Sequence, residues 1–171
     1  TNNGSLTSSN GGTLNLSGSI AAGGLGTVTN TGSDIFLKGT LQNSGQATDL
    51  SQLTIYGGSV MGGQIDNASF FGMNSSDNQL HGVILGTDTT ISGAAINIYD
   101  GLTIADGKTL TINASNIFTA NASTIDSLGN ATVTFVASGF LGQNSSSSAH
   151  DITIGSGIEI NGGSGSIGNG G

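Results

Sequence analysis

The segment from Leu102 to Ile112 reads LTIADGKTLTI and carries the pattern on which the fold prediction depends. Aliphatic residues alternate with threonine on both sides of Asp106-Gly107, which is the period-two pattern of a half-buried strand. An Asp-Gly pair favours a tight turn because both residues tolerate a positive φ. The segment therefore predicts one of two structures. It forms either an antiparallel hairpin or two faces of one solenoid coil joined at a corner.

The same alternation recurs along most of the chain, whereas apolar residues at helical spacing are almost absent. Gly-rich pairs such as Gly57-Gly58 and Gly62-Gly63 separate the strand-like stretches. This organisation predicts an all-β protein, either a β-solenoid or an antiparallel β-sandwich. The predicted strands are Thr13–Leu16, Asp34–Leu37, Leu53–Tyr56, Gly82–Leu85, Ile96–Tyr99, Leu102–Ile104, Thr109–Ile112, Ala131–Val136, Asp151–Ile154 and Gly157–Ile160.

Composition favours the solenoid over the sandwich. Charged residues make up 7% of the chain, against about 25% in an average soluble domain. Stacked coils place equivalent residues about 4.8 Å apart, so like charges would repel, while Asn, Thr and Ser can hydrogen-bond along the stack. Phrases such as Asn67-Ala68-Ser69 and Asn113-Ala114-Ser115 recur. We expect a parallel, right-handed β-solenoid with roughly 20 residues per coil.

The whole chain, residues 1–171, is predicted to be a single solenoid segment. Departures from the repeat predict inserted loops near residues 69–81 and 143–149, and the C-terminal end is rich in Gly and Ser. The chain begins at Thr1 without a leader-like segment, so we expect a processed product or an excised segment. No apolar run approaches the roughly 20 residues of a transmembrane helix.

The charge balance argues against a nucleic-acid partner. The formal net charge is -8, and Lys38 and Lys108 are the only Lys or Arg residues. Neutralising phosphates requires more cations than these two. The absence of Cys suits a secreted protein that does not depend on disulfides, although cytosolic proteins also lack them.

Several phrases resemble the parallel β-helix passenger segments of bacterial autotransporters and filamentous-haemagglutinin-type adhesins. They are Gly12–Gly18, Val28–Gly32, Gly39–Gly45 and Leu102–Asn113. The resemblance implies a bacterial extracellular or cell-surface location and a structural or adhesive role. It also implies head-to-tail self-association or continuation into a longer solenoid, with attachment to glycans or other surfaces. It carries over no catalytic residue.

We expect neither enzymatic activity nor a cofactor. The carboxylates mostly adjoin turn residues, and a lyase would also need cations to stabilise developing charge. His81 and His150 have no His or Cys partner nearby for a zinc site. A calcium ion at a turn remains an alternative, for which Asp77 and Asp100 are weak candidates, so no metal ligand is assigned. The ten acids are Asp34, Asp49, Asp66, Asp77, Asp88, Asp100, Asp106, Asp126, Asp151 and Glu159.

Two alternative functions stay open, and one contact surface is predicted. A carbohydrate-binding or carbohydrate-processing β-helix would need aromatic platforms and clustered acids on one face. An ice-binding solenoid would need a regular threonine array, and the Thr-x-Thr pairs are irregularly spaced. Adjacent strand residues point to opposite faces, so one ring of Phe70-Phe71 is a candidate contact surface. The pairs are Thr27/Thr29, Thr29/Thr31, Thr87/Thr89, Thr109/Thr111 and Thr132/Thr134.

Overall fold

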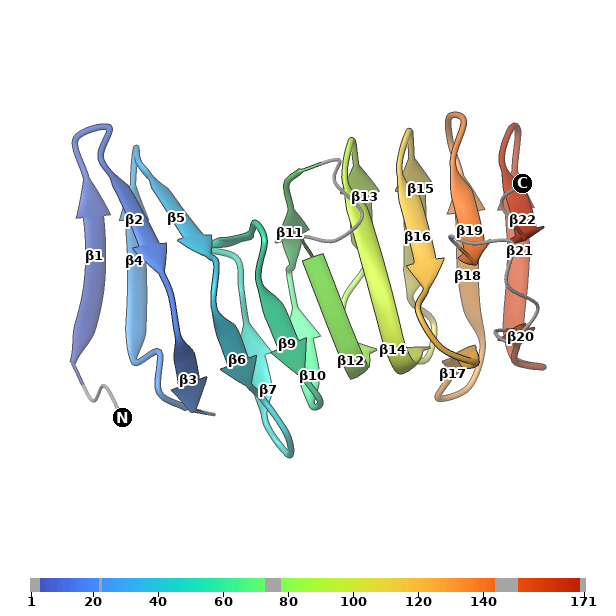
Figure 1. Ribbon diagram of the computed structural model, residues 1–171, viewed down its shortest axis with the longest axis horizontal. Helices are drawn as coiled ribbons and strands as arrows, with labels where there is room; N and C mark the ends of the chain where they lie inside the picture. Colours follow the sequence, from blue (N-terminus) through green and yellow to red (C-terminus); the bar gives the residue numbers. More distant parts are fainter. Residues whose placement is uncertain (1–3, 22, 73–77, 144–150, 170–171) are drawn as a thin grey trace.

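The computed structural model describes residues 4–21, 23–72, 78–143 and 151–169, and within them it is all-β (Figure 1). Strands follow one another along a rod, and each paired strand of the described chain lies parallel to its neighbour. The predicted parallel β-solenoid is confirmed. The antiparallel sandwich is wrong, because strands pair with the equivalent strand one coil away rather than with their neighbours in sequence.

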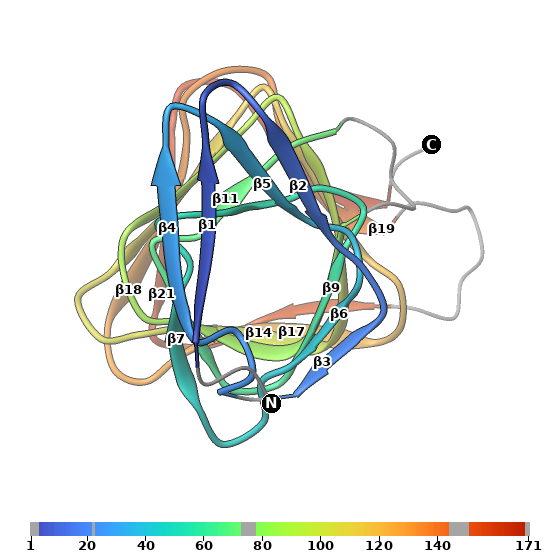
Figure 2. The ribbon, with the colours of Figure 1, turned by 90° about the vertical axis from the view of Figure 1, so that its left-hand side faces the viewer.

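Each coil contributes strands to three faces, which we call faces 1, 2 and 3 in the order in which the chain visits them. Figure 2 looks along the axis from the N-terminal end. The chain runs clockwise from β1 through β2 and β3 to β4 as it recedes, so the solenoid is right-handed. Face 1 is built from β1 (Ser5–Ser9), β4 (Thr27–Thr31), β7 (Ala47–Asp49), β10 (Gln64–Asp66), the second half of β12 (Asn78–Leu85), the second half of β14 (Ala95–Ile104), β17 (Ser123–Ser127) and β20 (Ile152–Ile154).

Faces 2 and 3 complete each coil. Face 2 consists of β2 (Thr13–Leu16), β5 (Asp34–Leu37), β8 (Thr54–Ile55), β11 (Ser69–Phe70), β13 (Thr89–Ser92), β15 (Thr109–Asn113), β18 (Ala131–Phe135) and β21 (Ile158–Gly162). Face 3 consists of β3 (Ser19–Ala21), β6 (Thr40–Gln42), β9 (Ser59–Met61), the first halves of β12 and β14, β16 (Asn116–Thr119), β19 (Phe140–Gln143) and β22 (Ser166–Asn169).

Face 3 forms an unbroken series of eight paired strands from β3 to β22. Its register measures the coil length. Asn78 pairs with Ile96, 18 residues later, and Phe140 pairs with Ser166, 26 residues later. The expected length of roughly 20 residues lies within this range. Variation in coil length is absorbed at the corners, so the strands stay in register on the faces.

The core is a column of aliphatic side chains inside the rod. On face 3, Leu41, Val60, Leu80 and Ile98 are paired in successive coils, and each is essentially inaccessible to solvent. Burying such a side chain contributes about 1.5–3 kcal/mol. The alternating sequence follows directly from this arrangement, because every second residue of a strand faces the interior.

The segment Leu102–Ile112 forms a corner rather than a hairpin. Leu102–Ile104 belongs to β14 and pairs with β12 and β17, whereas Thr109–Ile112 belongs to β15 and pairs with β13 and β18. Gly107 has a φ of 68° at the turn between them. The hairpin interpretation is therefore wrong: the Asp-Gly turn redirects the chain to the next face instead of reversing it onto the same sheet.

The predicted inserted loops mostly lie outside the described residues, at 73–77 and 144–150, and stay predictions. The edges of the first one are strands, since Ser69–Phe70 forms β11 and β12 begins at Asn78. The Gly/Ser-rich C-terminal end contributes a further strand, β22, which pairs with β19. Across the described residues no helix has the length and apolar character to cross a membrane.

Candidate contact surfaces

The acidic residues of the described chain mostly act as corner residues that tie coils together. Asp88 Oδ1 accepts the Thr109 backbone N–H at 2.9 Å, and Asp106 Oδ1 accepts the Asn130 N–H at 2.8 Å. Each bond joins one coil to the next. Asp106 also packs directly over Gly129, where a Cβ would collide with the carboxylate. These carboxylates replace ladder hydrogen bonds at turns, where the backbone leaves the sheet.

Asp49 is the acid whose ionisation the fold perturbs most clearly. The Ser51 backbone N–H donates to its Oδ1 at 2.9 Å, and Asn67 Nδ2 donates to the same oxygen at 3.1 Å. Both bonds favour the charged form, so the pKa of Asp49 is lowered, chiefly by the Ser51 N–H. The carboxylate stays anionic at the solvent-exposed edge of β7.

His81 lies in an aromatic stack on face 3. Its ring is parallel to that of Tyr99, with centroids 4.4 Å apart, and its Nδ1 lies 3.9 Å from Asp100 Oδ2. Within the described segments, no three His, Cys, Asp or Glu residues are grouped so that they could hold a metal ion. His150 and Asp77 lie outside the described residues. Asp100 is instead bound by Asn121, whose Nδ2 donates to it at 3.2 Å.

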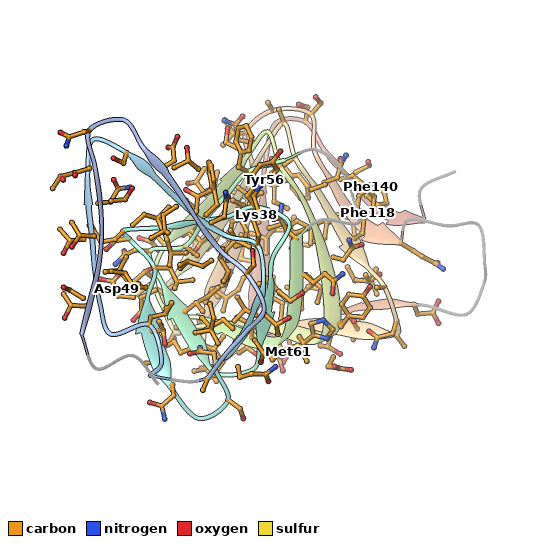
Figure 3. The ribbon with its side chains drawn as sticks, turned by 60° about the vertical axis from the view of Figure 1, so that its left-hand side comes forward. Lys38, Asp49, Tyr56, Met61, Phe118 and Phe140 are labelled. Carbon is orange, nitrogen blue, oxygen red and sulfur yellow. The ribbon has the colours of Figure 1, made fainter. Side chains whose placement is uncertain are left out.

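The predicted contact at Phe70-Phe71 divides as the strand alternation requires. Phe70 is 8% exposed and faces the core, whereas Phe71 is 57% exposed. Phe71 packs edge-on against Tyr56 at 5.0 Å between ring centroids, and Tyr56 packs edge-on against Phe36 at 5.3 Å. Lys38 Nζ lies 4.8 Å from the Tyr56 centroid, a cation–π contact. We call Phe36, Lys38, Tyr56 and Phe71 the aromatic patch; Figure 3 labels Lys38 beside Tyr56.

Sequence reasoning identified Phe71 but missed its three neighbours. Phe36, Tyr56 and Phe71 are separated by 20 and then 15 residues, so their association depends on two unequal coil lengths. A second ring pair, Phe118 and Phe140, lies on face 3 with centroids 5.7 Å apart (Figure 3). The outward surface is therefore aromatic in two separate places.

Two Thr-x-Thr pairs come into register on face 2. Thr109 pairs with Thr132 and Thr111 with Thr134, and Thr90 of the preceding coil pairs with Thr111. The alternate residues of these strands are buried, so the threonines face outward. We call these five residues the threonine array. Their 21- and 23-residue separations look irregular in sequence, but coil length varies while register does not.

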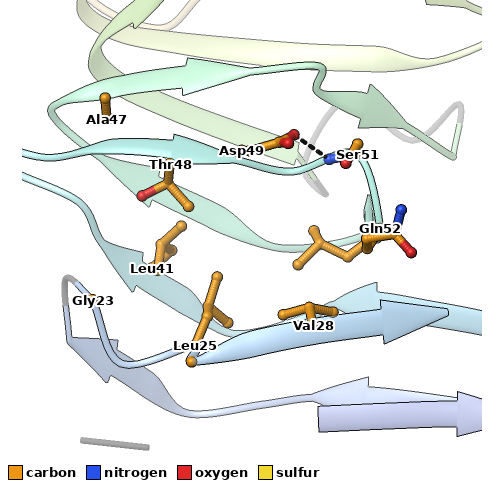
Figure 4. A pocket seen from close by; sticks show the side chains of 11 residues that line it. Gly23, Leu25, Val28, Leu41, Ala47, Thr48, Asp49, Ser51 and Gln52 are labelled. Atoms are coloured by element: carbon orange, nitrogen blue, oxygen red, sulfur yellow. Dashed lines mark hydrogen bonds between the residues drawn. The ribbon is translucent and has the colours of Figure 1, made fainter. Parts of the chain in front are cut away.

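The wall of face 1 is open between β4 and β7. Strand β4 belongs to a two-stranded sheet with β1, whereas β7 pairs with β10 in the large sheet. We call the opening between them the wall gap (Figure 4). It encloses about 340 Å³. Its lining includes the aliphatic side chains of Leu25, Val28, Leu41 and Leu53, with Thr48, Asp49 and Gln52 also around it.

The two ends of the rod expose part of its core. Inward aliphatic residues of the middle coils are buried, but those of the terminal coils are only partly buried against the core. At the C-terminal end, Ile160 and Ile167 are 40% and 42% exposed. The partly buried set is Leu6, Leu14, Leu16, Ile20 and Val28 near one end and Ile152, Ile154 and Ile158 near the other.

Fold, corner hydrogen bonds and outward polar rows together define the class: the chain is a parallel β-solenoid. Comparison with known proteins adds no narrower relationship, because no family model, curated protein or solved structure matches this chain.

Proposed function

We propose that this chain is a structural, adhesive segment of a bacterial extracellular or cell-surface protein, and that it acts by associating end to end. The observation that carries the proposal is the state of the two ends. Half-buried aliphatic residues lie in the first and last coils, while the same positions in the middle are closed. Covering them would add apolar burial at both ends of each rod.

Backbone geometry supports the same association. The terminal strands pair on one side only: β3 pairs with β6, and β22 pairs with β19. The outer edge of such a strand offers N–H and C=O groups to another strand. Stacking a second rod in parallel register would extend the ladders of all three faces. The next coil of a longer solenoid would do so in the same way.

The test is sedimentation velocity over a wide concentration range, with negative-stain electron microscopy of the same samples. Wild-type chain should form end-to-end oligomers that lengthen with concentration. The double variant Ile160→Lys, Ile167→Lys places charges on the C-terminal end and should remain monomeric. A strictly monomeric wild-type chain at high concentration would overturn the proposal.

The matched control is a charge of the same kind on the side wall. Val136 and Leu128 are 60% and 63% exposed, more than the end residues. The double variant Leu128→Lys, Val136→Lys should therefore assemble as wild type does. If both double variants lose assembly equally, the contact is not at the ends.

The aromatic patch is our candidate for surface attachment. Exposed rings stack on the apolar faces of sugars, and Lys38 beside Tyr56 adds a donor. A glycan array with wild type and Phe71→Ala would test this role. Binding that disappears in Phe71→Ala supports it, and binding that is unchanged, or absent in both, dismisses it.

Ice binding is a second candidate function, favoured by the register of the threonine array. Rows of outward threonines on neighbouring strands, about 4.8 Å apart, present methyl and hydroxyl groups at regular intervals. Thermal hysteresis and ice-crystal shaping by the wild type, both lost in Thr111→Lys, would support it. Unshaped crystals in wild-type solutions would dismiss it.

A further inference from the structure

The wall gap lies between two strand edges that face each other across an apolar floor. We infer that it binds one extended peptide strand, inserted parallel to β4 and β7. This inference is independent of the end-to-end association, since the gap lies in the side wall. The occupant is defined by its chemistry: a short segment with small aliphatic residues at alternate positions, uncharged polar residues between them and one cation.

Hydrogen bonds on both sides identify the backbone groups that face the gap. On β4, the Thr27 N–H bonds to Gly4 of the first coil, so the odd-numbered residues face β1 and the even-numbered ones face the gap. On β7, Gln46 accepts from Gln64 and the Leu50 N–H donates to Asp66. The main-chain groups of Ala47 and Asp49 therefore point towards β4.

One side chain already acts as a substitute for the missing strand. The Asn30 N–H, on the gap side of β4, donates to Gln52 Oε1 at 3.0 Å. An amide oxygen thus takes the place that a strand carbonyl would occupy. Gln52 comes from the turn after β7, so this bond spans the opening. An amide oxygen is what a peptide ligand would offer at every second residue of this edge.

The lining determines the side chains of the occupant. Val28, Leu25 and Leu41 form an apolar floor, so inward side chains must be aliphatic. The volume of about 340 Å³ is at the lower end of ligand pockets, which suits a few residues rather than a long strand. Asp49 is the one ionisable residue of the lining and its pKa is lowered, so a cation is favoured next to it.

The experiment uses a fluorescein-labelled synthetic peptide of alternating threonine and valine with one lysine at a polar position, measured by fluorescence anisotropy. Two control peptides have N-methylated amides at alternate residues, or glutamate in place of lysine. The unmodified peptide should bind saturably, the N-methylated peptide should not bind, and the glutamate peptide should bind more weakly. Equal binding of the parent and N-methylated peptides would contradict strand insertion.

Substitution at Ala47 separates backbone pairing from a general apolar contact. Ala47→Pro removes an N–H that faces the gap and should weaken binding about 3- to 10-fold, the loss of one hydrogen bond. Ala47→Val keeps that N–H and should bind the peptide as wild type does. Binding that ignores the Pro substitution overturns the inference.

Hydrogen exchange on the wild-type chain gives a readout that needs no variant. The peptide should slow exchange of the Val28, Ala47 and Asp49 amides, on both edges of the gap, and leave β14 unchanged. Absence of peptide binding, or protection confined to other faces, would overturn the proposal. An apolar dye that binds where the peptide does not would do so as well.

Discussion

The closed wall around β12 and β14 and the open wall between β4 and β7 are built from the same kind of coil. In the closed region, Leu80, Val83 and Leu85 of β12 all face inward and are buried. In the open region, the corresponding parity places Asn30 on β4 and Thr48 on β7. Aliphatic inward positions therefore accompany continuous pairing, and polar ones accompany the break.

A buried amide explains where β7 goes instead. Asn43 is fully buried, and its Nδ2 donates to the Gln64 carbonyl at 2.8 Å while its Oδ1 accepts from Thr48 Oγ1 at 2.6 Å. The corner after β6 is thereby fixed to the following coil rather than the preceding one. The polar pair satisfies itself, but it leaves β4 without a partner on that side.

The largest expected effect contrasts cavity formation in the two regions. Ile98→Ala in the closed core should lower the free energy of unfolding by about 3 kcal/mol, because a fully buried side chain leaves a cavity. Val28→Ala beside the wall gap should cost only about 1 kcal/mol, since this side chain is already partly exposed. Urea denaturation of both variants measures the difference. Equal losses would mean that the gap is closed in solution.

A pair of glycines tests how tightly the corner at Asn43 is fixed. Gly63 has a φ of 70°, and a Cβ there would collide with the Asn43 carbonyl. Gly107 has nearly the same φ but open space around it. Gly107→Ala should cost about 1–2 kcal/mol from backbone strain alone. Gly63→Ala should cost more in the same denaturation experiment; a smaller loss would show that the corner can move.

Removal of the buried amide should loosen the same corner. Asn43→Ala leaves a carbonyl and a hydroxyl without their partner and should cost about 2 kcal/mol. Asn113→Ala is the control, because the Asn113 amide makes an exposed bond to Ser92 Oγ at 3.3 Å. Thermal unfolding followed by circular dichroism compares them. A smaller shift for Asn43→Ala than for Asn113→Ala would contradict the role given to Asn43.

The sequence predicts strands where aliphatic residues alternate for four residues or more. Thr13–Leu16 and Asp34–Leu37 coincide with β2 and β5. Strands of two or three residues, such as β7 and β11, have too few positions to show a period, and they are set by pairing with neighbouring coils. The long-range contacts fail for a related reason: the aromatic patch and the threonine array depend on coil lengths that vary from one coil to the next.

Phe71 and the wall gap show the two limits of prediction for the site. Strand alternation alone places Phe71 outside, because Phe70 must fill the core. No local pattern predicts a missing strand pair, although polar Asn30 and Thr48 at inward positions are a signal that could have been read. Local periodicity fixes the direction of a side chain, whereas the closure of a wall depends on residues two coils apart.

The smallest expected effect is the acid response of the gap edge. The Ser51 N–H, and secondly Asn67, lower the pKa of Asp49, so its charged form stabilises the fold above the unfolded value of about 3.9. That contribution is lost as pH falls through this value towards the lower folded pKa. Asp49→Asn should therefore lower Tm near neutral pH, and its difference from wild type should shrink below about pH 4. Asn67→Gly removes only the second donor and tolerates the φ of 53°, so it should give a smaller difference of the same sign. A Tm difference for Asp49→Asn that stays constant from pH 2 to pH 7 would mean that these hydrogen bonds do not hold the edge of β7.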